Sequence, residues 1–97
     1  MELNIIMAVN KVKIRNEAGI HCRPSSLIMQ KVLEYPDCSF NVECSKGEAD
    51  LTSILTLMSL ALEQGEEVKV TVNGPDEEEV CRKVSELFAY EFDFPPQ

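Results

Sequence analysis

Three segments of the chain alternate apolar and polar residues one by one, and this pattern limits the folds that the chain can adopt. The segments are VNKVKIR (9–15), SFNVEC (39–44) and EEVKVTVNG (66–74). A two-residue period places one face of a β-strand in a core and leaves the other face in water. Strands of this kind favour an antiparallel sheet with one solvated face, because the strands of a parallel sheet are apolar along their whole length.

Segments with helical spacing separate these strands. A first helix is predicted over 24–35, where Pro36 stops it. A second is predicted within 50–65, with Ser53 as its N-cap and Gly65 as its C-terminal cap. The apolar stripes consist of Ile28, Val32 and Tyr35 in the first helix and of Ile54, Leu57, Met58 and Ala61 in the second.

A third helix is predicted near the end of the chain. Asp76 is its expected N-cap and Glu79 the partner in a capping box. The predicted buried stripe consists of Val80, Val84, Leu87 and Phe88. The expected ion pairs one turn apart are Glu78 with Arg82 and Glu79 with Lys83. The tail at 91–97 is expected to lie outside the packed fold.

These elements follow one another in the order βαββαβα, with a turn at 45–48 leading to a short returning strand. We therefore predict an α+β fold, an open-faced two-layer β-sandwich in which three helices cover one face of a four-stranded antiparallel sheet. The 97 residues are enough for one domain over 1–97, with a core at about 9–92.

The charge of the chain argues against several partners. Seventeen acidic and nine basic residues give a formal net charge of −8, which repels nucleic acid and anionic membrane surfaces. The acidic excess lies entirely in the second half, so a negatively charged partner can still approach the first half. No apolar run reaches the about 18 residues needed to enter and span a bilayer.

The four cysteines form no CxxC pair, so we predict no metal site. No bound cofactor is expected either. A chain with unpaired thiols and no targeting segment is expected to be a cytoplasmic protein. We expect it to be a monomer.

Chemistry concentrates in GIHCRPSS (19–26), around the single histidine of the chain. Gly19 allows an unusual turn, and Pro24 suits the first turn of a helix. His21 is therefore expected at a helix N-terminus, where free amide groups, the helix dipole and Arg23 favour a negative group. A neutral imidazole is a nucleophile near neutral pH, so His21 can carry a phosphoryl group. A plain helix cap is the alternative for an isolated histidine.

The run Gly-Ile-His-Cys-Arg-Pro-Ser at 19–25 resembles the motif G-[apolar]-H-[small]-R-P-[Ala/Ser]. This motif marks the HPr phosphocarriers of the bacterial phosphoenolpyruvate-dependent phosphotransferase system. A second family segment, Ser-Ile-[Leu/Met] at the start of an apolar helix, matches 53–55. Length and element order agree as well. Cys22 departs from the family, which usually has Ala or Thr there.

The resemblance implies that His21 accepts a phosphoryl group from enzyme I and passes it to a IIA domain. Family members use the Nδ1 nitrogen, and Arg23 would neutralise the group while nearby backbone amides hold its oxygens. The chain would then be a carrier in sugar uptake rather than a complete enzyme.

For Ser53, the resemblance adds a second role to helix capping. In many carriers of this family, HPr kinase/phosphorylase phosphorylates the serine at this position. The added charge would repel an acidic partner and block transfer. Thr52 and Thr56 stand where such carriers often have lysine and glycine.

A partner-binding patch is also expected, because one short helix cannot bury all of its apolar residues against a single sheet. In the family, the two helix starts form one apolar surface. The candidates are Cys22, Ser26, Gln30, Ile54, Leu55 and Met58.

Two other interpretations fit parts of the sequence. Cys22 beside His21 is compatible with a thiol hydrolase, but no third orienting residue is evident. Within the family, the segments 74–79, 86–88 and 91–94 also resemble the nitrogen-related branch, whose carriers regulate rather than feed sugar uptake. The sequence leaves the choice between the two branches open.

Overall fold

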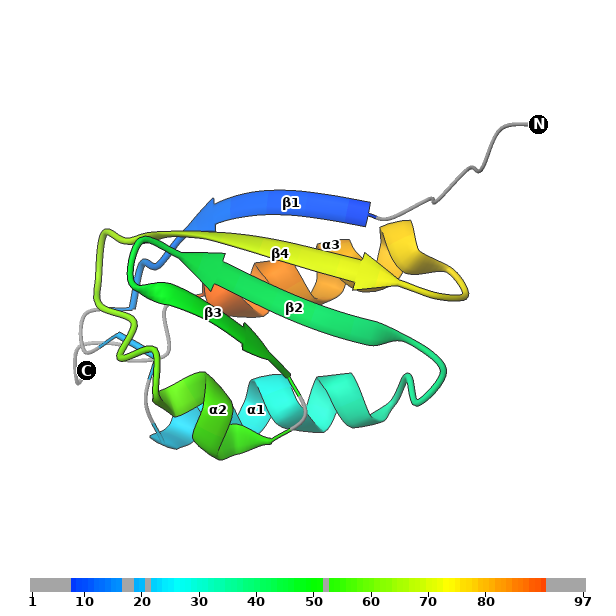
Figure 1. Cartoon of the computed structure of the whole chain (residues 1–97), viewed down its shortest axis with the longest axis horizontal. Coiled ribbons are helices and arrows are strands. Elements are labelled where there is room, and N and C mark those ends of the chain that lie inside the picture. Colours follow the sequence, from blue (N-terminus) through cyan, green and yellow to red (C-terminus); the bar gives the residue numbers. More distant parts are fainter. Residues whose placement is uncertain (1–7, 17–18, 21, 52, 91–97) are drawn as a thin grey trace, which may run out of the picture.

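The computed structural model describes residues 8–16, 19–20, 22–51 and 53–90. Four strands and three helices follow one another in the predicted order (Figure 1). They are β1 (Ala8–Lys13), α1 (Cys22–Leu33), β2 (Ser39–Cys44), β3 (Gly47–Asp50), α2 (Ile54–Met58), β4 (Glu67–Asn73) and α3 (Glu77–Phe88).

The four strands form one antiparallel sheet in the order β1-β4-β2-β3. The last strand in the sequence is therefore central, between β1 and β2. Its inward residues Val68, Val70 and Val72 are fully buried. Val68 pairs with Val12 of β1, and Val70 pairs with Val42 of β2. The strand that this alternating pattern predicts is thus the one that pairs with both β1 and β2.

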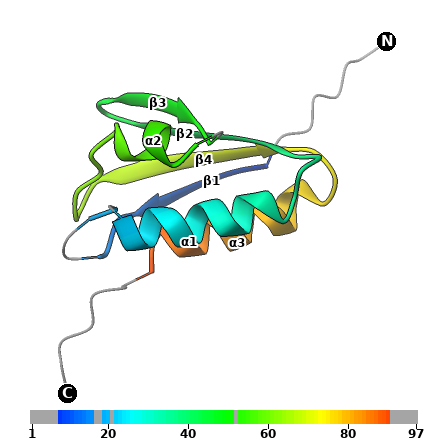
Figure 2. The ribbon, with the colours of Figure 1, turned by 90° about the horizontal axis from the view of Figure 1, so that it is seen from below.

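Helices α1 and α3 lie side by side along one face of the sheet, while α2 lies at the β3 edge and packs against α1 (Figure 2). The predicted α+β open-faced sandwich is confirmed. In the core between the layers, Ile28 of α1, Leu57 of α2 and Phe88 of α3 are each fully buried. Burial of such side chains contributes about 1.5–3 kcal/mol each relative to exposure. Among the described residues, no helix is long and apolar enough to cross a membrane.

Helix α1 is shifted by two residues from its predicted range. It begins at Cys22 rather than at Pro24, so Pro24 occupies its first turn. It ends at Leu33, before the predicted Tyr35, because the amides of Glu34 and Tyr35 bond to carbonyls three residues back and tighten the last turn. Tyr35 packs against the core from beyond the helix end.

Helix α2 is shorter than predicted, since it ends at Met58. Leu60 and Leu62 are both buried, at 7% and 3% exposure, but residues two apart point to different sides of a helix. The chain leaves the helix and turns at Ala61, which has φ +47°, so both leucines reach the core. The predicted cap at Gly65 is wrong, because Gly65 lies in the later turn before β4.

The predicted capping box of α3 is also absent. Asp76 stands at the N-cap position in the left-handed region, with φ +55°, and its side chain makes no capping hydrogen bond. Instead, Glu77 Oε1 accepts a hydrogen bond from the backbone N–H of Gly74 (3.0 Å). The left-handed backbone turns the Asp76 carboxylate away from the amides that an extended N-cap residue would reach.

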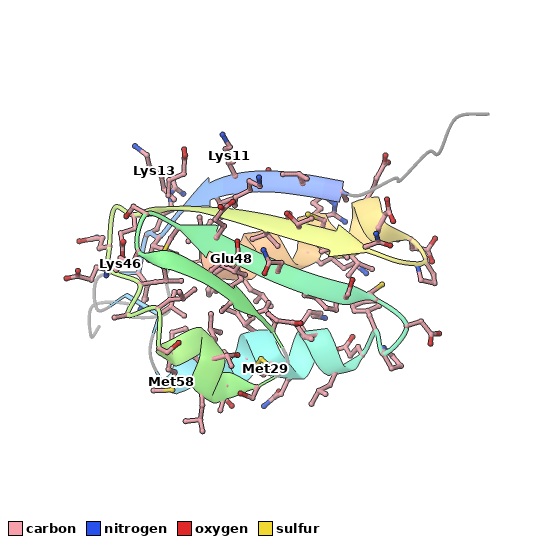
Figure 3. All side chains as sticks on the ribbon, viewed as in Figure 1. Lys11, Lys13, Met29, Lys46, Glu48 and Met58 are labelled. Carbon is pink, nitrogen blue, oxygen red and sulfur yellow. The ribbon has the colours of Figure 1, made fainter. Side chains whose placement is uncertain are left out.

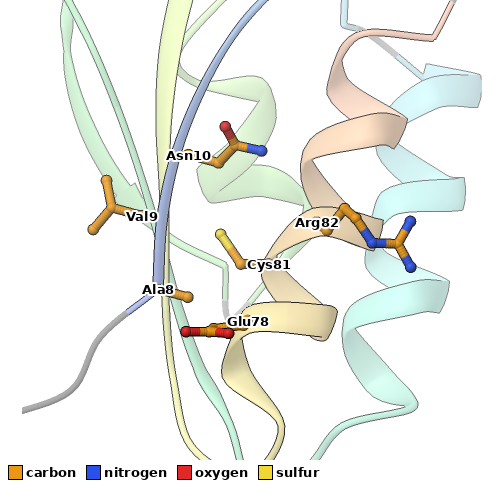
Figure 4. A pocket seen from close by; sticks show the side chains of 6 residues that line it. All are labelled: Ala8, Val9, Asn10, Glu78, Cys81 and Arg82. Carbon is orange, nitrogen blue, oxygen red and sulfur yellow. The ribbon is translucent and has the colours of Figure 1, made fainter.

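One of the two ion pairs predicted on α3 forms. Lys83 Nζ lies 3.6 Å from Glu79 Oε1. Arg82 pairs with Glu86 (3.1 Å) rather than with Glu78. Figure 4 shows the reason, since Glu78 points towards β1 and Arg82 points away from it.

Candidate functional site

The described part of the candidate site begins with the main chain of α1. The helix starts at Cys22, directly after position 21, so its first-turn amides lie next to the predicted phosphoryl acceptor. His21 itself and the side chains of Cys22 and Arg23 lie outside the described residues. Pro24 and Ser25 belong to this first turn and are buried, which fixes the helix start against the core.

Two buried residues ahead of α1, Asn16 and Gly19, are hydrogen-bonded to each other. The amide of Gly19 donates to Asn16 O (2.9 Å), and Asn16 Nδ2 donates back to Gly19 O (2.8 Å). Gly19 has φ +77°, a region that residues with a Cβ atom rarely adopt. A Cβ atom added here would collide with the carbonyl oxygen of Leu62. Glycine is thus favoured at this position for two reasons, the backbone conformation and the close approach of a second chain segment.

That second segment is the loop between α2 and β4. The amide of Ile20 donates to Leu62 O (2.9 Å), and Ile20 is itself buried. Farther back, Gly65 N donates to Ile14 O (2.8 Å) and Ile14 N donates to Glu66 O (2.9 Å). The chain leading to His21 is therefore hydrogen-bonded to residues far away in the sequence. Sequence reasoning missed this loop, because it assigned these residues to a longer helix.

Ser53 caps α2 as predicted. Its backbone is extended, and its Oγ accepts a hydrogen bond from Thr56 N (3.3 Å). Thr56 adds a contact that the sequence did not reveal, since its hydroxyl lies 2.9 Å from Asp50 O and 2.7 Å from Ser53 O. The start of α2 is thus hydrogen-bonded to the end of β3.

Helix α2 lies beside the N-terminal half of α1, as both ribbon views show (Figures 1 and 2). Leu57 is fully buried, whereas Leu55 is 75% exposed and Ile54 and Met58 are half-buried. The prediction that some apolar residues of this helix stay outside the core is correct. Ser26 and Gln30 are exposed on α1. Met29, which was not predicted, is half-buried on the same helix (Figure 3).

Two other cysteines do not resemble nucleophiles. Burial raises the pKa of the Cys81 thiol, and a hydrogen bond with Ser85 offsets part of that effect. The pKa of Cys38 is raised by partial burial and then by the carboxylates of Asp37, Glu77 and Asp76. Both thiols therefore stay protonated near neutral pH.

A cavity of about 300 Å³ lies between β1 and α3 (Figure 4). Its lining residues are Ala8, Val9, Asn10, Glu78, Cys81 and Arg82. It includes none of the predicted site residues. Within the described part of the chain, no cluster of three or more histidine, cysteine or acidic residues could hold a metal ion.

Comparison with known proteins identifies the family. The family model described as "PTS HPr component phosphorylation site" matches residues 8–90. The chain belongs to the HPr family of phosphocarrier proteins. It is 31% identical to phosphocarrier protein HPr of Treponema pallidum, over 90% of this chain and 98% of the relative. It is also 33% identical to the HPr-like protein Crh of Bacillus subtilis, over 81% of this chain and 92% of the relative.

Solved structures of the family share the fold. HPr from Bacillus anthracis matches with a TM-score of 0.77 at 24% identity, over 84% of this chain and 96% of that one. HPr-C-His from Thermoanaerobacter tengcongensis matches with a TM-score of 0.75 at 31% identity, over 82% and 89%. Crystalline Crh, described as a domain-swapped dimer, matches with a TM-score of 0.65 at 30% identity, over 81% and 90%.

Two glycine substitutions test the contact between the segment that enters α1 and the loop between α2 and β4. Gly19→Ala must place a methyl group against Leu62 O in an unfavourable backbone conformation, so we expect a loss of about 3 kcal/mol in the free energy of unfolding. Gly65→Ala is the matched control, because Gly65 has φ +91° but open space around its Cβ position. It should lose only about 1 kcal/mol. Urea unfolding measures both, and equal losses would contradict the close contact at Gly19.

Proposed function

We propose that this chain accepts a phosphoryl group on His21 from phosphorylated enzyme I and passes it to a histidine of a IIA domain. The observation that carries the proposal is the position of GIHCRPSS. The run lies inside the segment matched to the family model, and α1 begins at the residue after His21. A phosphoryl group at this position would meet the free amides and positive dipole end of a twelve-residue helix.

In the proposed transfer, the P–N bond to the donor histidine breaks as a new P–N bond forms at Nδ1 of His21. The onward step is the same exchange with the IIA histidine as acceptor. Arg23 neutralises charge on the moving group, and the first-turn amides hold its oxygens. Pro24 lacks an amide hydrogen, so among residues 22–25 the donors are Cys22, Arg23 and Ser25. Because the phosphoryl group must both arrive at and leave His21, the P–N bond formed there should not be strongly stabilised.

The partners are proposed to dock on the apolar residues of α2 that stay outside the core and on the neighbouring start of α1. These are Ile54, Leu55 and Met58 of α2, next to Ser26 and Gln30 of α1 and the neighbouring Cys22. Methionine adapts its shape to different surfaces, which suits a carrier with more than one partner. Docking here would place a partner across α2 and the beginning of α1.

Ser53 is proposed as a regulatory site on the same surface. Its hydroxyl accepts a hydrogen bond at the start of α2, one residue before the apolar patch. A phosphate there would add about 1.5–2 negative charges. The helix start tolerates such charge with a gain of about 0.3–1 kcal/mol, but a like charge on a partner costs several kcal/mol. Phosphorylation would therefore preserve the fold and block docking.

The similarity to Crh favours a second candidate function, a regulatory rather than a transport role. Crh is described as a catabolite repression protein in its solved structures. The nitrogen-related branch is a regulatory alternative of the same kind, and both branches would use the same chemistry at His21. Transfer assays to a sugar-type and a nitrogen-type IIA domain separate the roles.

We propose that the chain works as a monomer, in contrast to the swapped Crh dimer.

Incubation with enzyme I and phosphoenolpyruvate tests the proposed acceptor directly. The expected product is an adduct that is labile in acid and stable in base, as phosphohistidine is. His21→Ala should abolish it, and Ser53→Ala should leave it intact. An adduct that survives acid as the only product, or one that persists in His21→Ala, would contradict the proposal.

Two exposed leucines test the docking surface. Leu55→Ala should raise the KM of phosphorylated enzyme I for this chain about tenfold, because it removes an apolar contact at the proposed interface. Leu33 is the matched control, since it is 73% exposed but lies at the other end of α1, about 16 Å along the helix axis from its start. Leu33→Ala should change the KM less than about twofold. Equal effects would show that α2 is not the docking helix.

Ser53→Asp tests the proposed regulation. Aspartate is as good an N-cap as serine, so thermal unfolding should stay within a few degrees of the parent. The added charge should lower the second-order rate constant for phosphoryl acceptance about tenfold or more. Asn73→Asp is the charge control, because Asn73 is exposed at the far end of β4. A normal rate constant for phosphoryl acceptance in Ser53→Asp would contradict the proposed regulatory role of Ser53.

A further inference from the structure

Lys46 forms the centre of a polar cluster that neither the motif nor the proposed transfer step uses. It lies in the turn between β2 and β3, and its side chain reaches the loop between α2 and β4 (Figure 3). Its Nζ donates to Ala61 O at 2.6 Å and lies 3.2 Å from Glu66 Oε2 and 3.4 Å from Glu63 Oε1. One ammonium group therefore contacts three residues of a single loop.

The loop has a conformation that needs support. Ala61 has φ +47°, and only one other described non-glycine residue, Asp76, has a positive φ. A Cβ atom makes this region unfavourable, so the conformation persists only where surrounding contacts fix it. The short hydrogen bond from Lys46 to the carbonyl of Ala61 is such a contact. It fixes the peptide unit that joins Ala61 to Leu62.

Glu66 closes the loop from the other end. Its Oε2 accepts a short hydrogen bond from Glu63 N (2.6 Å) and lies next to Lys46. The Glu63 amide is the main reason why the pKa of Glu66 lies below its usual range. Partial desolvation opposes this effect, and Lys46 adds to it. The carboxylate therefore remains charged at neutral pH, and the loop is held at both Ala61 and Glu66.

The same loop supports the entrance to the candidate site. Lys46 bonds to the carbonyl of Ala61, and Ile20 bonds to the carbonyl of the next residue, Leu62. Ile20 directly precedes His21. Two consecutive carbonyls of one short loop thus connect the ammonium of Lys46 with the main chain ahead of the proposed phosphoryl acceptor.

We propose that Lys46 is a positioning residue for phosphoryl transfer, acting through Ala61 and Leu62 on the main chain at Ile20. This inference rests on the proposed function. Lys46 does not need to touch the phosphoryl group. Its side chain is partly exposed and its ion pairs are of the surface type, which contribute little to global stability. Its effect is therefore expected in the local order of the loop and of the site entrance, rather than in the unfolding of the core.

Amide hydrogen exchange measures this local effect. In Lys46→Met, the Ile20 amide should exchange about tenfold faster than in the parent, while the core amides of Val70 and Val84 keep their protection. Lys46→Arg should retain most of the protection, because it can still donate to Ala61 O. Lys69→Met is the matched control. Lys69 is a half-exposed lysine whose ion pair with Glu43 (3.5 Å) does not involve the loop. It should leave Ile20 unchanged.

Transfer kinetics supply the second readout. Single-turnover acceptance from phosphorylated enzyme I should slow about threefold to tenfold in Lys46→Met, with the KM for enzyme I unchanged. The rate should recover in Lys46→Arg. In an Ala61→Gly background the effect of Lys46→Met should shrink, because glycine adopts a positive φ without help.

The outcomes separate this inference from the proposed function. Failure of the parent chain to accept a phosphoryl group would refute the proposed function and with it the positioning role. If the parent accepts the group, unchanged Ile20 exchange in Lys46→Met would overturn the inference and leave the proposed function standing. Faster exchange with an unchanged transfer rate would also overturn it, because the loop would then be ordered by Lys46 without consequence for the site.

Discussion

The hydrogen bond from Ile20 N to Leu62 O joins the chain that enters α1 to the loop that leaves α2. The two segments can approach each other only because residue 19 is a glycine, and because the turn at Ala61 brings Leu62 into the core. The start of α1, the loop after α2 and the exposed apolar residues of α2 depend on this contact for their relative placement. The first of these elements, α1, begins directly after the motif histidine in the sequence.

The sheet and its helices were predictable because burial imposes a period on the sequence. Val68, Val70 and Val72 alternate with polar residues, and all three are fully buried in the central strand. The stripe of α3 was predictable for the same reason, since Val80, Val84 and Phe88 all face the core. Patterns of this kind report which side of an element is apolar. They do not report where a loop takes over from a helix, and the overlong prediction for α2 shows this limit.

Site features set by local chemistry were also predictable. Ser53 caps α2 as predicted, and the unusual turn that glycine allows at position 19 is present as a positive φ. Features set by contacts between distant segments were not. The bonds of Thr56 to Asp50 and of Lys46 to Ala61 join residues that only the fold brings together. The capping box at Asp76 failed because a left-handed backbone, which the residue type alone does not reveal, turns the side chain away.

The proposed function depends on one ring nitrogen, Nδ1 of His21. The most direct measurement is an NMR spectrum of the chain with isotope-labelled histidine, recorded before and after addition of enzyme I and phosphoenolpyruvate. Since His21 is the only histidine of the chain, a single set of imidazole signals reports the reaction. We expect the Nδ1 resonance to shift and to couple to phosphorus, and to return to its starting position when a IIA domain is added. An imidazole spectrum that stays unchanged while phosphate appears elsewhere on the chain would contradict the account.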